Sequence, residues 1–231
     1  MKKILVLVGI IVLFAAIPVF ADDFNKTIEE EQNIQNHISE IGYKILNTNK
    51  IDVRMVFAYN KKDKLIKGFP ALTKRQIVLY EKNIKYAQTD DETAALLARE
   101  ICKTAESYTG EIKGAIGAIQ TTLAPKKFEI FFDKRAVDFM VTAGYNPLGM
   151  ITYINKAYPQ KRFDRFGHTN LTSKRLANIY EYIYFKYPYF LANNEYIENE
   201  YYQNFLLTSQ ENRKKLRNKI KNNSKEIIKY E

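Results

Sequence analysis

The chain has 231 residues, and Lys and Arg outnumber Asp and Glu by 36 to 26, which gives a net charge of +10 at pH 7. The single cysteine, Cys102, excludes an internal disulfide, so the fold must depend on its hydrophobic core. The basic residues are scattered along the chain and are densest near its C-terminus. This distribution does not favour nucleic acid as a partner.

The first 21 residues have the pattern of a secretory signal peptide. Two lysines precede an apolar run over residues 4–17, and Val19 and Ala21 occupy the −3 and −1 positions of a small-residue cleavage site. The alternative is an uncleaved anchor, because the apolar run approaches the length of a spanning helix. We expect cleavage and export of residues 22–231 to the periplasm or the medium, with membrane contact only through an uncleaved signal segment.

Periodic apolar residues predict an N-terminal helix followed by a small sheet. Apolar residues stand at every second position of 51–57, which predicts a half-buried strand. A second short strand is expected over residues 76–80. The helix is predicted over residues 24–47, where isoleucines recur at helical spacing: Ile34, Ile38, Ile41 and Ile45.

The rest of the chain is predicted to be helical. Thr89 and Glu92 form a capping box that starts one helix, and Gly144 provides a left-handed cap at the end of another. The expected fold class is therefore α+β and mostly helical, with the small sheet near the N-terminal side. The helices after Thr89 are expected over residues 126–143, from Asn146 and Pro147 onward, over 172–184 and over 212–220.

The helix that begins at Thr89 resembles the active helix of the HtpX/BepA-type (prenyl-protease-like) zinc metallopeptidases. In that family an acidic start leads through an Ala/Leu-rich stretch into H-E-x-x-H, whose histidines bind zinc and whose glutamate activates water. Glu100 stands at the glutamate position of this motif, as a vestigial general base. Arg99 and Lys103 stand at the two histidine positions.

Further segments resemble the family in the same order. Glu129 and Asp133 are similar to the E-x-x-x-D that supplies the third zinc ligand and a supporting carboxylate, and residues 139–147 resemble the helix end and Gly-Tyr-x-Pro turn that follow. His168 and Arg175 resemble the family's His-Pro…Arg segment, with Thr169 in place of proline. A fainter match is Lys67-Gly68-Phe69-Pro70, before the strand that in the family lies along the substrate.

The resemblance implies a minigluzincin-like helical core over residues 22–185, followed by a Tyr-rich and then basic extension over 186–231. It also implies a lost zinc site, because neither guanidinium nor ammonium offers zinc a lone pair. We therefore expect no cofactor at the vestigial ligand positions Arg99, Lys103 and Glu129. Instead we expect the helices that carry Glu100 and Glu129 to pack face to face, with Arg99 and Lys103 both pointing toward Glu129. At least one of these two cations should form an ion pair with Glu129 or Asp133.

Three functions remain open at this point. The first is a non-catalytic metallopeptidase-like protein that binds protein or envelope partners outside the cytoplasm. The second is an active zinc-dependent metalloendopeptidase whose ligands lie elsewhere in the chain. The third is a basic module that binds anionic envelope polymer through the C-terminal lysines and arginines. We expect Cys102 to be a small packing residue, with a reactive thiol as the alternative.

Overall fold

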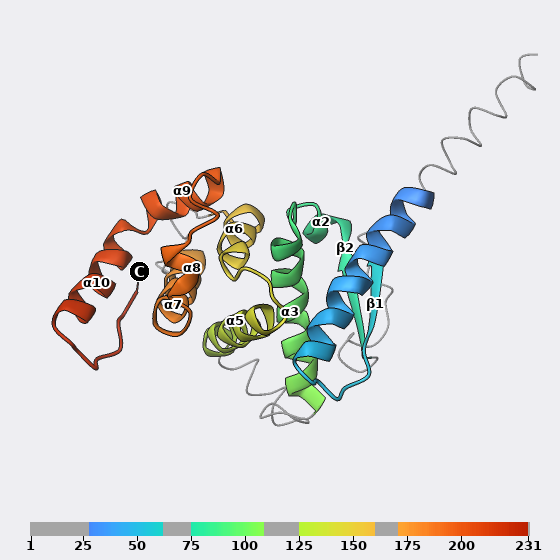
Figure 1. Ribbon diagram of the computed structural model, residues 1–231, viewed down its shortest axis with the longest axis horizontal. Helices are drawn as coiled ribbons and strands as arrows, with labels where there is room; N and C mark the ends of the chain where they lie inside the picture. Colours follow the sequence, from blue (N-terminus) through green and yellow to red (C-terminus); the bar gives the residue numbers. More distant parts are fainter. Residues whose placement is uncertain (1–27, 62–74, 109–124, 160–170, 231) are drawn as a thin grey trace, which may run out of the picture.

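The structure is a computed structural model, and it describes residues 28–61, 75–108, 125–159 and 171–230. Helices predominate, and the described residues contain one small parallel sheet, which confirms an α+β, mostly helical chain. The sheet and the N-terminal helix lie at one end in Figure 1, and the C-terminal helices lie at the other. None of the helices within these ranges is long and apolar enough to cross a membrane.

The sheet consists of β1 (Val56–Asn60) and β2 (Gln76–Tyr80), paired in parallel with Val56 opposite Gln76. The second strand has its predicted bounds. The first begins at Val56, several residues later than predicted, although Val53 and Met55 are buried as the alternation requires. The alternation of residue types thus predicted correctly which side chains are buried. Hydrogen bonding to β2, however, starts only where the partner strand is available.

The N-terminal helix, described over residues 28–48, covers the other edge of β1. The side-chain amide of Gln35 donates to the carbonyl of Phe57 at 2.9 Å and accepts from the N–H of Tyr59 at 2.7 Å. One side chain therefore satisfies the two strand groups that a third strand would otherwise bind. This contact fixes the helix against the sheet.

A short helix, α2 (Glu81–Ile84), leads from β2 to α3 (Asp90–Tyr108), which lies between the sheet side and the C-terminal helices in Figure 1. The Thr89 hydroxyl accepts from the N–H of Glu92 at 3.3 Å, as the capping box predicts. The Glu92 carboxylate instead reaches the N–H of Gln88, one residue before the expected donor, at 2.8 Å. The apolar stripe of α3 is fully buried: Ala94, Leu97 and Ile101.

Helix α5 (Pro125–Thr142) packs against α3 and ends in a left-handed turn. Gly144 has φ +79°, and the N–H of Tyr145 donates to the carbonyl of Met140 at 2.9 Å, so the predicted glycine cap is confirmed. Helix α6 (Leu148–Ala157) begins two residues after Asn146, whose side chain still accepts from the N–H of Leu148 at 3.0 Å.

The C-terminal part contains α7 (Leu171–Lys186), α8 (Tyr189–Ala192), α9 (Glu200–Thr208) and α10 (Gln210–Lys221). Helix α9 was not predicted, although the Asn199 side chain caps it by accepting from two N–H groups. It packs on α6, and the aromatic residues of this segment join the main core: Tyr196, Tyr202 and Phe205. The tyrosine-rich segment is therefore packed against the rest of the protein.

Candidate functional site

Arg99 connects α3 to α5 through ion pairs with two carboxylates. Its Nε donates to Oδ1 of Asp133 at 2.8 Å, and its Nη2 donates to Oε2 of Glu129. The Arg99 side chain is 13% exposed, so water competes little for these contacts. The expected ion pair between the two helices is present, and Arg99 provides it.

Arg175 reaches the same carboxylate from α7. Its Nε donates to Oδ2 of Asp133 at 2.8 Å and its Nη2 to Oδ1 at 2.8 Å, and its Nε lies 3.9 Å from Oε2 of Glu129. The Asp133 side chain is only 1% exposed. A two-pronged contact of this kind fixes both the distance and the orientation of a guanidinium. We call Arg99, Arg175, Glu129 and Asp133 the arginine–carboxylate cluster, and it joins three helices.

The charges of the cluster balance, with two guanidinium groups against two carboxylates. Burial by itself lowers the pKa of Arg175, but the hydrogen bonds and the charge of Asp133 outweigh burial and raise it. The nearby phenol of Tyr153 has a pKa that is raised, chiefly by burial. Arg175 thus keeps its charge in a site where a neighbouring phenol stays neutral.

Lys103 does not take part in the cluster, contrary to the expectation that both cations point at Glu129. Its ammonium binds the Glu100 carboxylate at 2.8 Å, one turn earlier on α3. Both side chains are partly exposed, at 26% and 34%. Because Arg99 already holds Glu129, the nearer carboxylate on its own helix is the better partner for Lys103. Glu100, which was expected to be a vestigial general base, is therefore held in a local ion pair.

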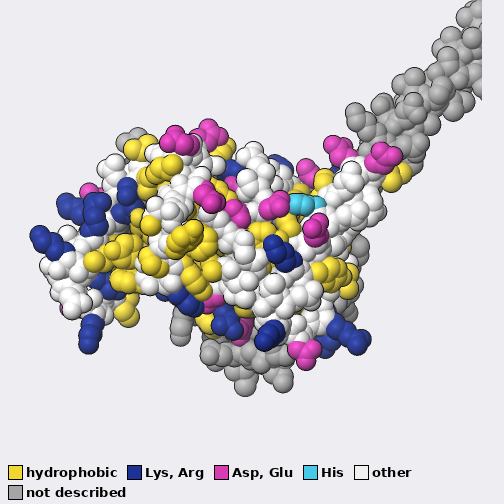
Figure 2. Space-filling model, in the orientation of Figure 1, with side chains coloured by type: hydrophobic (Ala, Val, Ile, Leu, Met, Phe, Trp, Pro, Cys, Tyr) yellow, Lys and Arg dark blue, Asp and Glu magenta, His cyan; other side chains and the backbone are white. Residues whose placement is uncertain are grey.

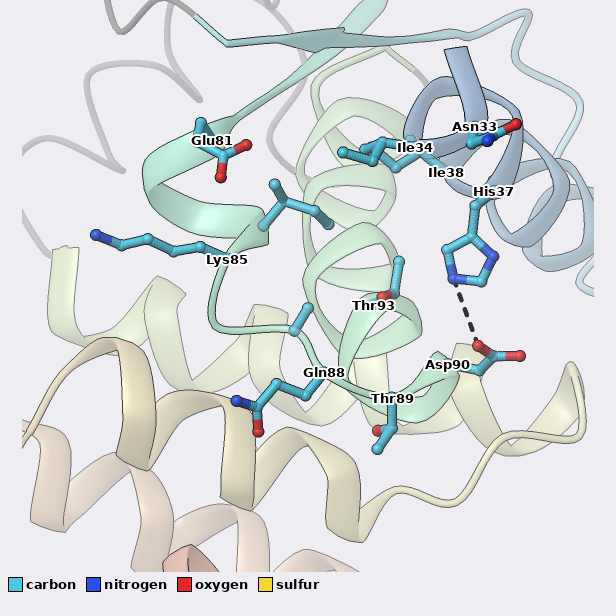
Figure 3. Close-up of a pocket in the computed structure, with 12 residues that line it drawn as sticks. Asn33, Ile34, His37, Ile38, Glu81, Lys85, Gln88, Thr89, Asp90 and Thr93 are labelled. Carbon is cyan, nitrogen blue, oxygen red and sulfur yellow. Dashed lines mark ion pairs between the residues drawn. The ribbon is translucent and has the colours of Figure 1, made fainter. Parts of the chain in front are cut away.

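Among the described residues, His37 is the one histidine, and it adds no ligand to the cluster. His168 lies outside the described residues. Nε2 of His37 lies 3.4 Å from the carboxylate of Asp90, at the start of α3, and Figure 3 shows the two side chains pointing toward one another. The nine residues from Asp90 to Arg99 span about 13 Å of helix, so His37 lies far from the cluster.

His37 and Asp90 instead stand beside a separate pocket of about 390 Å³ (Figure 3). Its lining comes from the N-terminal helix, α2 and the start of α3, with Ile34 and Ile38 on the apolar side. Charged groups of both signs line this pocket, including Glu81 and Lys85, and their arrangement does not favour one class of ligand. We assign no ligand to this pocket.

The arginine–carboxylate cluster does not fit a zinc ion. Zinc requires lone-pair donors, and both oxygens of Asp133 already accept from guanidinium groups. A guanidinium about 4 Å from a dication would be repelled by roughly 8 kcal/mol at an effective dielectric of about 20. Within the described ranges, no group of three His, Cys, Asp or Glu residues is arranged to hold a metal ion.

Cys102 is fully buried on α3. Burial is the largest influence on its thiol and raises the pKa, while the nearby cations oppose this only in part. A thiol with a raised pKa is not a nucleophile near neutral pH. The structure therefore supports the packing role that was expected.

A second buried ion pair was not predicted from the sequence. Nζ of Lys156 lies 2.7 Å from the Glu92 carboxylate, with side-chain exposures of 4% and 0%. The hydroxyl of Thr152 donates to the same carboxylate at 2.6 Å, and Lys156 also donates to the Gln88 side chain at 2.7 Å. The signal in the sequence was a lysine inside a mostly apolar helix, and the sequence assigned its partner Glu92 to capping alone.

Comparisons with protein-family models, with curated proteins and with solved structures gave no match for this chain.

Proposed function

We propose that this chain is an exported, metallopeptidase-like protein that has lost its catalytic zinc and acts by binding protein or envelope partners. One observation carries the proposal. Arg99, which stands at the first histidine position of the motif that the sequence resembles, forms ion pairs with Glu129 and Asp133, the carboxylates that stand at the third-ligand and supporting positions. A cation of the protein's own then neutralises the carboxylates.

The proposal also explains the ion pairs of Arg175 and Lys103. Arg175 completes the charge balance by binding Asp133 from α7, and Lys103 neutralises Glu100. Each carboxylate at a position of catalytic interest thereby has a cationic partner from the chain itself. Because the Glu100 carboxylate already accepts from the Lys103 ammonium, it is poorly placed to activate a water.

A protein of this kind retains a surface that can bind a partner, although it no longer catalyses peptide hydrolysis. The minigluzincin-like core is part of the proposal, as is export after removal of residues 1–21. The alternative is an active zinc-dependent metalloendopeptidase, and the arrangement around Arg99 argues against it.

Proteolysis of an unfolded test protein distinguishes the two. The purified mature chain should leave an unfolded casein substrate intact, with or without added zinc, and the Glu100→Gln variant should behave identically. Cleavage that zinc supports, that a chelator stops and that Glu100→Gln abolishes would replace the proposal with the enzyme.

Export is tested separately. We expect secreted or periplasmic protein to begin at Asp22, because Val19 and Ala21 mark the cleavage site. The N-terminal residue, determined by mass spectrometry of the native protein, decides this, and an intact Met1 would contradict it.

A further inference from the structure

A groove of about 390 Å³ runs between α7 and α10, at the end of the molecule farthest from the sheet. Tyr180 and Tyr184, one turn apart on α7, form one wall, and Leu216 and Ile220 of α10 contribute apolar surface. Figure 2 shows Lys and Arg side chains gathered at the end formed by α10, next to an area of hydrophobic side chains.

Three cations line the groove on one face of α10. They are Arg213, Arg217 and Lys221, which follow one another at intervals of four residues. Such residues lie one above the other on a helix, about 6 Å apart along its axis, so the row of charge is about 12 Å long.

The charges of Arg217 and Lys221 are not neutralised by an ion pair within the described residues. Among the residues that the structure describes, no carboxylate lies within ion-pair distance of Arg217 or Lys221. Lys219, on a different face of α10, is by contrast neutralised by Glu181 at 2.8 Å. Arg213 is held in place by the carbonyl of Leu206, to which it donates at 2.6 Å. The groove thus has a fixed cation at one end and two free ones beyond it.

The combination of apolar surface and regularly spaced charge identifies the ligand. In an extended peptide, alternate side chains lie on the same side, about 6.7 Å apart, which matches the spacing of the cations. The side chains between them point to the opposite side, toward the wall that Tyr180 and Tyr184 of α7 form. A phosphate polymer would satisfy the cations but would leave the partly exposed rings of Tyr180 and Tyr184 without a partner, and a flat bilayer does not fill a groove.

We propose that the groove between α7 and α10 binds an extended acidic peptide segment of a partner protein, with acidic side chains at alternate positions and apolar side chains between them. Arg213, Arg217 and Lys221 of α10 bind the carboxylates, while Tyr180 and Tyr184 on the α7 wall receive the apolar side chains. This site does not depend on whether the arginine–carboxylate cluster descends from a metal site.

Fluorescence anisotropy tests the proposal with the whole purified protein and a labelled peptide that alternates glutamate with leucine or valine. The Arg217→Glu/Lys221→Glu variant should bind at least about tenfold more weakly, since two attractive charges become repulsive. The matched control is Lys214→Glu/Lys225→Glu, which changes the net charge equally at two exposed lysines that do not line the groove. It should weaken binding less than about twofold.

Each other outcome counts against the proposal. Equal weakening in the control pair would mean that the peptide responds to net charge and not to the groove. Equal binding of a peptide with serine at the apolar positions, or of inorganic polyphosphate with the same dependence on Arg217 and Lys221, would make the groove a general polyanion site. Circular dichroism of both double variants verifies that they are folded, and absence of peptide binding by the unaltered protein would overturn the proposal directly.

Discussion

Arg99 and Arg175, which are 76 positions apart in the sequence, donate to the same oxygen, Oδ1 of Asp133. One guanidinium comes from α3 and the other from α7, so the carboxylate of α5 joins three helices. Two like charges can share so small a space only because Asp133 and Glu129 compensate them. The stability of this region therefore depends on the least exposed member, Asp133.

Asp133→Asn should lower the free energy of unfolding by about 3–5 kcal/mol, because it leaves two poorly hydrated guanidinium groups without their charged partner. Glu129→Gln is the matched control. The Glu129 side chain is 38% exposed, so its loss should cost less than about 1 kcal/mol. Urea denaturation measures both, and equal effects of the two variants would contradict the assignment of Asp133 as the central residue.

Glu92 and Lys156 should show strong energetic coupling. Lys156→Met alone leaves a buried carboxylate without its cation, and Glu92→Gln alone leaves a buried ammonium, so each should cost about 3–5 kcal/mol. The double variant should recover about 2–3 kcal/mol relative to the sum. A double-mutant cycle from thermal or urea unfolding gives this coupling, and additive losses would show that the pair does not act as a unit.

Gly149 is required by a close approach of α6 to α3. A Cβ at this position would lie 2.6 Å from Cβ of Asp91 and 2.9 Å from its carbonyl carbon. The contact would also disturb the carboxylate of Asp91, which accepts from the N–H of Asn146 at 2.8 Å. Gly149→Ala should therefore destabilise the protein by about 1–3 kcal/mol.

Gly144 provides the comparison for Gly149, because its φ is +79° but a Cβ there would meet nothing within 4 Å. Asparagine tolerates this backbone conformation, so Gly144→Asn should change the melting temperature only slightly. A loss of stability in Gly144→Asn as large as that in Gly149→Ala would remove the distinction between backbone conformation and close contact.

Tyr202 should make the protein sensitive to high pH. Burial raises the pKa of this phenol to about 12, whereas in the unfolded chain it ionises near 10. Its contribution to stability is complete below pH 10 and is lost as the pH rises toward 12, since only the unfolded state ionises readily in that window. At pH 11 the loss relative to neutral pH is about 1.4 kcal/mol. Tyr202→Phe should show a decline that is smaller by this amount in urea denaturation at pH 8 and 11, and an unchanged decline would contradict the assignment.

Local patterns were sufficient to predict β2, α3, α5 and the glycine turn at Gly144. Each depends on residues that are close in sequence: an apolar stripe, a capping side chain or a residue free to adopt positive φ. The start of β1 could not be predicted in this way. Its first hydrogen bond joins the N–H of Val56 to the carbonyl of Arg75, and only the partner strand determines where pairing begins.

The C-terminal part shows a second limit of sequence reasoning. Tyrosine is compatible with both core and surface, and the burial of Tyr202 and Phe205 depends on α6, which lies far away in the sequence. The signal that was available was Asn199, a good N-cap residue directly before Glu200. A cap of that kind predicts where a helix starts, although it does not predict what the helix packs against.

Within the site, the resemblance correctly directed attention to Arg99, Asp133 and Arg175, which the structure brings together. It placed Lys103 incorrectly, because the shorter-range partner Glu100 lies three residues away and competes successfully. The Glu92–Lys156 pair had no counterpart in the resemblance. Its two members are 64 positions apart, and no local pattern indicates such a pair.

The zinc content of the purified protein tests the central claim most directly. Inductively coupled plasma mass spectrometry should find far less than one zinc per chain in protein prepared with added zinc and without chelators. The Arg99→His/Lys103→His variant, measured alongside, should gain zinc because two imidazoles then accompany Glu129. One tightly held zinc per chain in the unaltered protein would contradict the claim that Arg99 has taken the place of the metal.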